Sequence, residues 1–269
     1  MFIKSVYLKQ PSEEQIISSI DSGIDTIFLN LNAGNTKEEL KFLFDEYYTK
    51  VNLVPFVFYT QPGKRIQTQD QFLSNGKYYH YIVCPTNINM IRKLLEFSLD
   101  LYADGLCSSV CINFKNYEVD EDWSTEDNKC ECSRCKELTG LQQKIRNMEI
   151  INESLKGMSL YSLPYVNPFL WTISDYWINE NTYTNKWRSY RNIYQYIRTM
   201  GKRNISIKNM SVVKFSMVKK AIKSVMTDGY CIYPDEQIDL NALTELNDNA
   251  DKWRGSWWFK FKRWVIGGK

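Results

Sequence analysis

The sequence predicts one soluble α/β domain of the (β/α)8-type TIM barrel class, in a regular or an incomplete form. Short runs of β-branched and aromatic residues alternate with longer segments of helical period, as parallel strands joined by crossover helices do. The chain has 269 residues, a usual length for such a barrel. No Gly-rich phosphate turn follows the first strand, which favours the barrel over an open doubly wound sheet with the same alternation.

Seven strands are expected along the barrel, and the segment from Trp171 to Tyr183 is the candidate for an eighth. Ser12 and Thr36 have the spacing of amino-terminal helix caps. The polar segment Gln61–Gly76 is expected to form a long loop, followed by an extended segment that ends at Cys84. The seven expected strands are Phe2–Leu8, Asp25–Leu31, Val51–Tyr59, Gly105–Phe114, Met158–Val166, Ile205–Lys208 and Tyr230–Tyr233.

Composition and charge are those of an ordinary globular protein. Hydrophobic residues make up 43% and charged residues 24% of the chain, and 34 basic against 31 acidic residues give a net charge of +3. This balance provides no global field for nucleic acid. With one histidine, His80, and no phosphate-binding or dinucleotide fingerprint, the sequence also disfavours serine-hydrolase and nucleotide-driven functions.

The amino terminus lacks the basic region, apolar run and small-residue cleavage site of a secretory signal. No stretch approaches the roughly 20 apolar residues of a spanning helix. The seven cysteines, an odd number in a chain of this size, favour reduced thiols or a metal over a disulfide framework. We therefore expect a cytoplasmic protein, or a virion-associated one if the gene is viral.

The most specific local pattern is a cysteine clip, Cys130-x-Cys132-x2-Cys135. Three thiolates at this spacing can surround one ion, and zinc suits soft sulfur ligands in tetrahedral geometry. Cys111 is the chosen fourth ligand, while Cys107, Cys84 and Cys231 are also available. A structural zinc, one disulfide and unpaired thiols remain as interpretations; a catalytic metal is disfavoured, and no organic cofactor is expected.

The segments around the fourth strand resemble those of glycoside-hydrolase-like barrels. The resemblance runs over Ala103–Leu106, Val110–Glu118 and the cysteine clip, which is about thirty residues. It implies a barrel with carboxylates at the strand ends and a glycan as ligand. Asn113 and Lys115 depart from the pattern, because they occupy the alternating positions where acids are expected. The alternative is therefore a non-catalytic barrel that serves as a binding or assembly module, associated with an envelope or a virion.

The clip also resembles that of tRNA-ribosyltransferases, which are base-exchange enzymes built on a barrel. Their zinc motif is completed by a downstream histidine, and no histidine follows Cys135 in this sequence. This resemblance is a third functional alternative, and it rests on the motif alone.

Glycoside hydrolysis requires two carboxyl groups across a cleft, and barrel chemistry is located at the carboxyl ends of strands. Glu118 after the fourth strand and Glu236 after the last are the predicted catalytic pair, with Asp235 beside Glu236. Flat aromatic rings and amide groups near strand ends can bind sugars. The predicted substrate-binding residues are Tyr59, Asn113, Tyr165, Trp171 and Tyr233.

Four of the eight tryptophans lie in the last 17 residues, interleaved with basic side chains. We expect a barrel domain over residues 1–250 and an aromatic and basic tail over residues 251–269. Tryptophan beside cations suits a membrane surface or a protein partner, through residues 252–266, and suits nucleic acid less well here. The other interpretation of the tail is a terminal element whose rings pack against the barrel.

Overall fold

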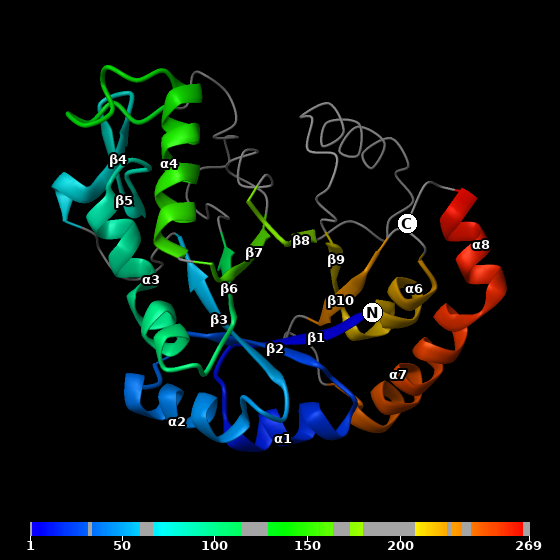
Figure 1. The fold of residues 1–269 in the computed structure, drawn as a ribbon. Helices are drawn as coiled ribbons and strands as arrows, with labels where there is room; N and C mark the ends of the chain where they lie inside the picture. The colour runs from blue at the N-terminus through cyan, green and yellow to red at the C-terminus, as the bar shows by residue number, and fades with distance from the viewer. Residues whose placement is uncertain are drawn as a thin grey trace. The chain divides into compact units, whose positions relative to one another are not determined.

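The computed structural model describes residues 2–31, 34–59, 67–113, 129–155, 157–163, 173–179, 208–224, 227–232 and 238–265. Within these residues the predicted fold class is confirmed. Parallel strands alternate with helices, and the strand order β1-β10-β9-β8-β7-β6-β3-β2 is that of a (β/α)8-type barrel (Figure 1). The chain divides into two compact units, one of Met1–Pro55 with Asp175–Lys269 and one of Phe56–Ser174.

The first unit is a parallel sheet with its crossover helices. Ser5 lies opposite Thr26 in the β1–β2 pair and opposite Cys231 in the β1–β10 pair. Its strands are β1 (Ile3–Leu8), β2 (Thr26–Asn30), β8 (Tyr176–Asn179), β9 (Lys208–Val213) and β10 (Gly229–Ile232). Its helices are α1 (Glu13–Asp21), α2 (Lys37–Tyr47), α6 (Val218–Lys223), α7 (Leu240–Gly255) and α8 (Trp257–Val265), with the 3-10 turn η3 (Phe215–Met217) before α6.

The second unit carries the rest of the parallel sheet and a hairpin. Strand β3 (Asn52–Phe58) begins in the first unit and ends in the second. Its carboxyl end pairs with β6, which in turn pairs with β7. In Figure 1, α3 and α4 pack side by side over these strands. The remaining elements are η1 (Thr68–Asp70), β4 (Gln71–Ser74), β5 (Lys77–Val83), α3 (Ile88–Ala103), β6 (Ser109–Asn113), α4 (Gly140–Leu155) and β7 (Ser159–Leu163).

The central strands are buried along their whole length. Every residue of β2, β6 and β10 is buried, as expected of parallel strands that are covered on both faces. Strand β10 begins at a glycine because β1 passes too close for a side chain. A Cβ atom at Gly229 would lie 2.6 Å from the carbonyl oxygen of Ile3.

Most predicted helix starts and strands are confirmed, but the predicted Gln61–Gly76 loop is wrong in part. Both predicted caps are confirmed, and Thr36 forms a full capping box with Glu39. The eighth strand, β8, lies in the segment proposed for it, and β9 begins at Lys208 rather than ending there. The prediction of one loop over Gln61–Gly76 was wrong in its last part, because β4 pairs antiparallel with β5.

An Asn-Gly turn explains this β4–β5 hairpin. Ser74 lies opposite Lys77, so the two-residue loop is Asn75-Gly76, and both residues have positive φ angles, 50° and 71°. Asparagine and glycine adopt this conformation at low cost, which makes the pair a strong hairpin signal. Gly76 is the last residue of the predicted loop, so this local signal argues against a loop that extends to that position.

Among the described residues, no helix is both long and apolar enough to cross a membrane.

Candidate metal centre

The hairpin and the cysteine clip lie together in the second unit. Cys84 follows β5 directly, and its backbone N–H donates to the carbonyl of Asp70 at 2.9 Å. The clip runs beside β4, where Glu131 N–H donates to the carbonyl of Leu73 at 2.7 Å. The hairpin is therefore the element that brings Cys84, 46 residues earlier in the chain than Cys130, to the clip.

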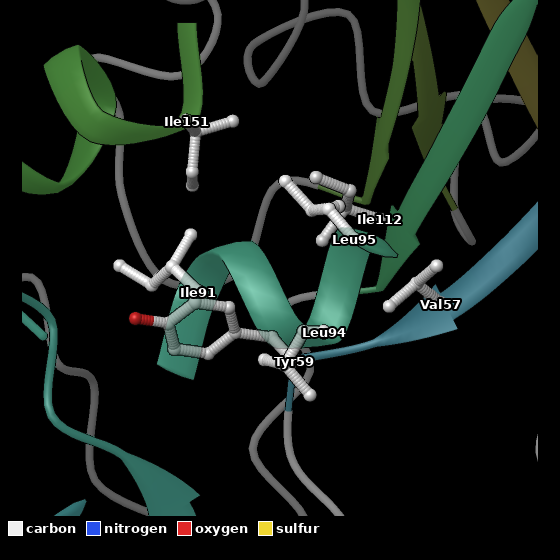
Figure 2. A pocket seen from close by; sticks show the side chains of 7 residues that line it. All are labelled: Val57, Tyr59, Ile91, Leu94, Leu95, Ile112 and Ile151. Atoms are coloured by element: carbon white, nitrogen blue, oxygen red, sulfur yellow. The ribbon is translucent and has the colours of Figure 1, made fainter. Parts of the chain in front are cut away.

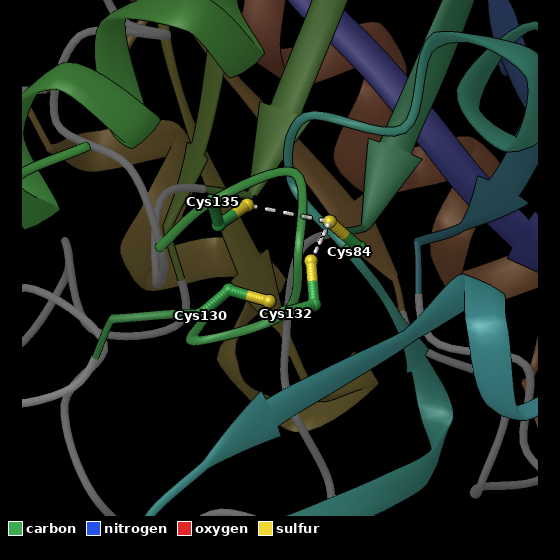
Figure 3. A group of neighbouring side chains, drawn as sticks. All are labelled: Cys84, Cys130, Cys132 and Cys135. Atoms are coloured by element: carbon green, nitrogen blue, oxygen red, sulfur yellow. Dashed lines mark hydrogen bonds between the residues drawn. The ribbon is translucent and has the colours of Figure 1, made fainter. Parts of the chain in front are cut away.

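Four thiols converge at this place. The Sγ atoms of Cys84, Cys130, Cys132 and Cys135 all lie within 4.8 Å of one another, and all four residues are buried. Figure 3 shows the sulfur atoms turned toward a common centre, with Cys84 at 3.5 Å from both Cys132 and Cys135. Tetrahedral Zn–S bonds of about 2.3 Å place sulfur atoms roughly 3.8 Å apart, so the spacing fits one ion.

The distances between the sulfur atoms also test the two other interpretations of the clip, a disulfide and unpaired thiols. Bonded sulfur atoms lie about 2.05 Å apart, and none of the seven cysteines, all of which are described, forms a disulfide in this structure. Neutral thiols are common in protein cores, so burial alone does not separate unpaired thiols from ligands. The convergence of all four sulfur atoms on one centre is what favours an ion.

Groups around the cluster favour negative sulfur. Thr86 Oγ1 lies 2.9 Å from Cys135 Sγ, and the backbone N–H of Leu73 donates to Cys130 Sγ at 3.5 Å. Hydrogen bonds from Cys130 and Cys135 lower the pKa of Cys84, whereas hydrogen bonds with Cys135 and Cys84 raise the pKa of Cys130, so the negative charge is favoured at Cys84. Burial lowers the pKa of Arg134, but its hydrogen bond to Cys84 and the nearby charges of Cys84, Cys132 and Asp70 together outweigh this effect and leave the pKa raised. Such outer partners stabilise thiolate ligands and offset part of their charge.

A glutamine from α4 holds the backbone of the clip in place. The Gln143 side chain is buried, its Oε1 accepts from Cys130 N–H at 2.8 Å, and its Nε2 donates to the carbonyls of Cys130 at 2.8 Å and Cys135 at 3.2 Å. One side chain therefore fixes the orientation of two ligand-bearing residues.

The structure brings together three of the four predicted metal ligands. Cys130, Cys132 and Cys135 belong to the cluster, whereas the fourth thiol is that of Cys84 and not that of Cys111. Cys111 lies in β6 and is buried in the sheet, where its neighbours are the paired strands β3 and β7. Cys84 was one of the alternatives from the sequence. Its position before Pro85 and a helix cap at Asn87 gave no metal-specific signal.

The predicted catalytic residues Glu118, Asp235 and Glu236 lie outside the described residues, as do Tyr165, Trp171 and Tyr233. Asn113 is the last residue of β6 and is buried, with its carbonyl accepting from the backbone N–H of Tyr59 at 2.9 Å. The structure therefore leaves the predicted catalytic pair as a prediction.

Tyr59 lies inside the second unit. Its hydroxyl accepts from Asn147 Nδ2 at 2.9 Å, and burial raises its pKa well above the usual value. Its ring borders a small apolar void of about 10 Å³ between α3, α4 and the strands (Figure 2). A void of this volume holds at most one water molecule, so it excludes a sugar. The lining residues are Val57, Tyr59, Ile91, Leu94, Leu95, Ile112 and Ile151.

Comparison with known proteins finds similar folds among solved structures but no similar sequence family. No family model and no curated protein matches the chain. Among solved structures, a family 36 α-galactosidase from Geobacillus stearothermophilus, in complex with raffinose, has a TM-score of 0.56 at 10% identity, over 94% of this chain and 42% of its own. The present chain thus spans less than half of that enzyme.

Two further structures match over most of both chains. A maltogenic α-amylase from Thermotoga neapolitana has a TM-score of 0.52 at 8% identity, over 94% of this chain and 76% of its own. An endo-β-N-acetylglucosaminidase from Cordyceps militaris has a TM-score of 0.53 at 12% identity, over 93% of this chain and 90% of its own. At these identities the likeness establishes the barrel fold alone.

Proposed function

We propose that this chain is a glycan-recognising (β/α) barrel in which a structural zinc ion holds the β4–β5 hairpin to the cysteine clip. The observation that carries the zinc is the convergence of four buried thiols within 4.8 Å. Four thiolates leave no open coordination position, which is typical of a structural rather than a catalytic zinc. The ion would cross-link segments that are distant in sequence.

Metal content of the purified protein tests the zinc directly. We expect about one zinc per chain from wild type in reducing buffer, and loss of most of it in Cys84→Ser, which removes one of four ligands. Cys107→Ser is the matched control, because Cys107 lies outside the cluster and is only half-buried. Wild-type protein without bound zinc, or equal metal content in both variants, would overturn the zinc site.

The glycan proposal rests on the fold and on what its structural neighbours act on. An α-galactosidase, a maltogenic α-amylase and an endo-β-N-acetylglucosaminidase share the fold, and each is a glycan-cleaving enzyme by name. One fold hosts many chemistries, so the neighbours support a glycan ligand without assigning a reaction. In such barrels the ligand binds at the carboxyl ends of the strands.

For hydrolysis, we propose Glu118 and Glu236 as the carboxyl pair, with Asp235 as the neighbour of Glu236. In sequence, Glu118 follows the end of β6 by five residues, and Glu236 follows the end of β10 by four. Residues this close in sequence to strand ends would lie in the loops at the carboxyl ends, where one carboxyl group would protonate the leaving oxygen and the other would attack or activate water.

A hydrolysis assay over α-glucans, α-galactosides and N-acetylglucosaminides tests this pair. Glu118→Gln and Glu236→Gln should each lower the rate at least a hundredfold, about the minimum contribution of a general acid or base. Glu153→Gln, on the exposed face of α4, is the control and should keep full activity. Activity that survives both substitutions would remove the proposed site.

A non-catalytic binding module is the second candidate, and Asn113 favours it. This buried residue ends β6 at a position where the glycoside-hydrolase-like pattern expects an acid. Glycan binding measured by calorimetry without hydrolysis of the same glycan would select this candidate, whereas neither binding nor hydrolysis would contradict both. The base-exchange alternative gains no support, because a fourth cysteine from an upstream segment stands where that motif needs a downstream histidine.

A further inference from the structure

The last described helix, α8, has two different sides. On a helix of 3.6 residues per turn, positions 257, 258 and 261 share one side, and positions 259 and 263 share the opposite side. Phe259 is buried and packs edge-on against Trp253 of α7 at 4.8 Å between ring centroids. Arg263 pairs with Asp228, which precedes β10. One side therefore anchors α8 to the first unit.

The other side of α8 presents aromatic rings to solvent. Trp257 is 72% exposed and Trp258 is 54% exposed, and both rings stack with that of Phe261, at 5.4 Å and 5.9 Å between centroids. Indole rings with such exposure are unusual on a monomeric protein surface, and a cluster of them marks an interaction site. The stacking makes the three rings one continuous apolar ridge.

Basic residues border this ridge on both edges. Lys260 and Lys262 are exposed and lie, on the helical wheel, between the aromatic side and the anchored side. Lys262 Nζ lies 5.1 Å from the centroid of the Trp258 ring. Residues 252–266 include five basic and no acidic residues. Arg254 is buried and Arg263 is paired with Asp228, so the exposed cations are Lys252, Lys260 and Lys262.

We propose that α8 docks on an anionic lipid surface, with Trp257, Trp258 and Phe261 at the headgroup level. Tryptophan rings are favoured at that boundary, and flanking lysines complement anionic headgroups. A helix of nine residues that lies in the plane of the interface needs no spanning length. This docking is independent of the glycan site and of the zinc.

Sedimentation of the full chain with vesicles tests the proposal. The protein should bind phosphatidylcholine vesicles that contain phosphatidylglycerol, bind pure phosphatidylcholine much more weakly, and dissociate as salt screens the charges. Lys260→Glu with Lys262→Glu should weaken binding by at least roughly 25-fold, since each lysine near an anionic surface contributes about fivefold. Trp257→Ser with Trp258→Ser should also abolish most binding.

Matched variants elsewhere on the first unit serve as controls. Lys219→Glu with Lys220→Glu makes the same charge change on the exposed side of α6, and Phe42→Ser removes an exposed ring, 57% accessible, from α2. Both should sediment like wild type. Equal binding to the two vesicle types, no binding to either, or a dimer in sedimentation velocity that the Trp257→Ser, Trp258→Ser variant abolishes would each overturn lipid docking. Circular dichroism verifies that each variant is folded.

Discussion

The four-cysteine cluster turns its reactive atoms inward, whereas α8 turns its largest side chains outward. All four cysteines are at most 8% exposed, while Trp257 is 72% exposed. The cluster joins segments that are far apart in sequence, so its loss should affect folding. The aromatic side of α8 faces solvent, so we expect the loss of its indole rings to weaken binding to a partner and to leave the fold of the first unit intact. Burial, rather than residue type, separates the two roles.

Removal of the metal should have the largest effect. Structural zinc sites in small domains contribute about 10 kcal/mol or more of binding free energy, and that energy is folding energy for the segments that carry the ligands. After chelation we expect amide hydrogens in residues 71–84 and 129–138 to lose protection in hydrogen exchange. Those of β1, β10 and α7 in the first unit should keep theirs. Uniform loss of protection, or none, would contradict a local zinc staple.

Arg254→Ala should come next, with a loss of about 4 kcal/mol in the free energy of unfolding. Arg254 is buried, its guanidinium donates to the carbonyls of Ile222, Ser224 and Thr227, and it lies 3.9 Å above the Phe2 ring. The substitution leaves three carbonyls without their donor. Urea unfolding measures the loss, and Lys252→Ala, which is exposed, should change stability by less than about 0.5 kcal/mol. A loss of stability in Arg254→Ala as small as that in Lys252→Ala would contradict the packing of Arg254 in the core.

Gln143→Ala should lower stability by about 2–3 kcal/mol, because one donor and two acceptors of the clip backbone lose their buried partner. It should also speed the release of zinc to a chelator, since the clip is then less well ordered. Gln142→Ala on the exposed side of α4 removes only a hydrogen bond to Thr139 N–H and should cost about 1 kcal/mol or less. Equal release rates in the two variants would show that Gln143 does not order the ligands.

Trp257→Ser with Trp258→Ser should have the smallest effect on folding, within about 0.5 kcal/mol of wild type. The two indoles are largely exposed already, so their removal returns little surface to water. Phe259→Ser is the contrasting variant on the anchored side and should cost about 3 kcal/mol, through a cavity and a buried hydroxyl. Differential scanning calorimetry compares the two. Similar losses would remove the distinction between the sides of α8.

Much of the fold could be predicted from the sequence, because the spacing of apolar residues and the helix caps are local signals. Buried strands such as β2 and β6 stand out as short apolar runs, and Thr36 with Glu39 marks a helix start. The hairpin was missed because a polar surrounding outweighed the Asn75-Gly76 pair. In α8, aromatic residues lie on both the buried and the exposed side of the helix. Phe259 and Trp258 are adjacent in sequence, and only their angular positions around the helix axis place one inside and the other outside.

The site was accessible in part for the same reason. Cys130, Cys132 and Cys135 lie within six consecutive residues and form a local pattern, whereas the fourth thiol depends on which strand ends beside them. Cys111 lies in an apolar run and Cys84 follows one, and the choice of Cys84 depends on recognising the Asn75-Gly76 hairpin and on which segment it lies beside. Gln143 was invisible because a glutamine on a helix is ordinarily a solvated residue.

X-ray absorption at the zinc edge of the purified protein tests the four-thiol centre most directly. The structure predicts one shell of four sulfur atoms at about 2.3 Å, from Cys84 and the clip. A shell with three sulfurs and a nitrogen or oxygen neighbour near 2.0–2.1 Å, or a Cys84→Ser spectrum identical to that of wild type, would contradict it.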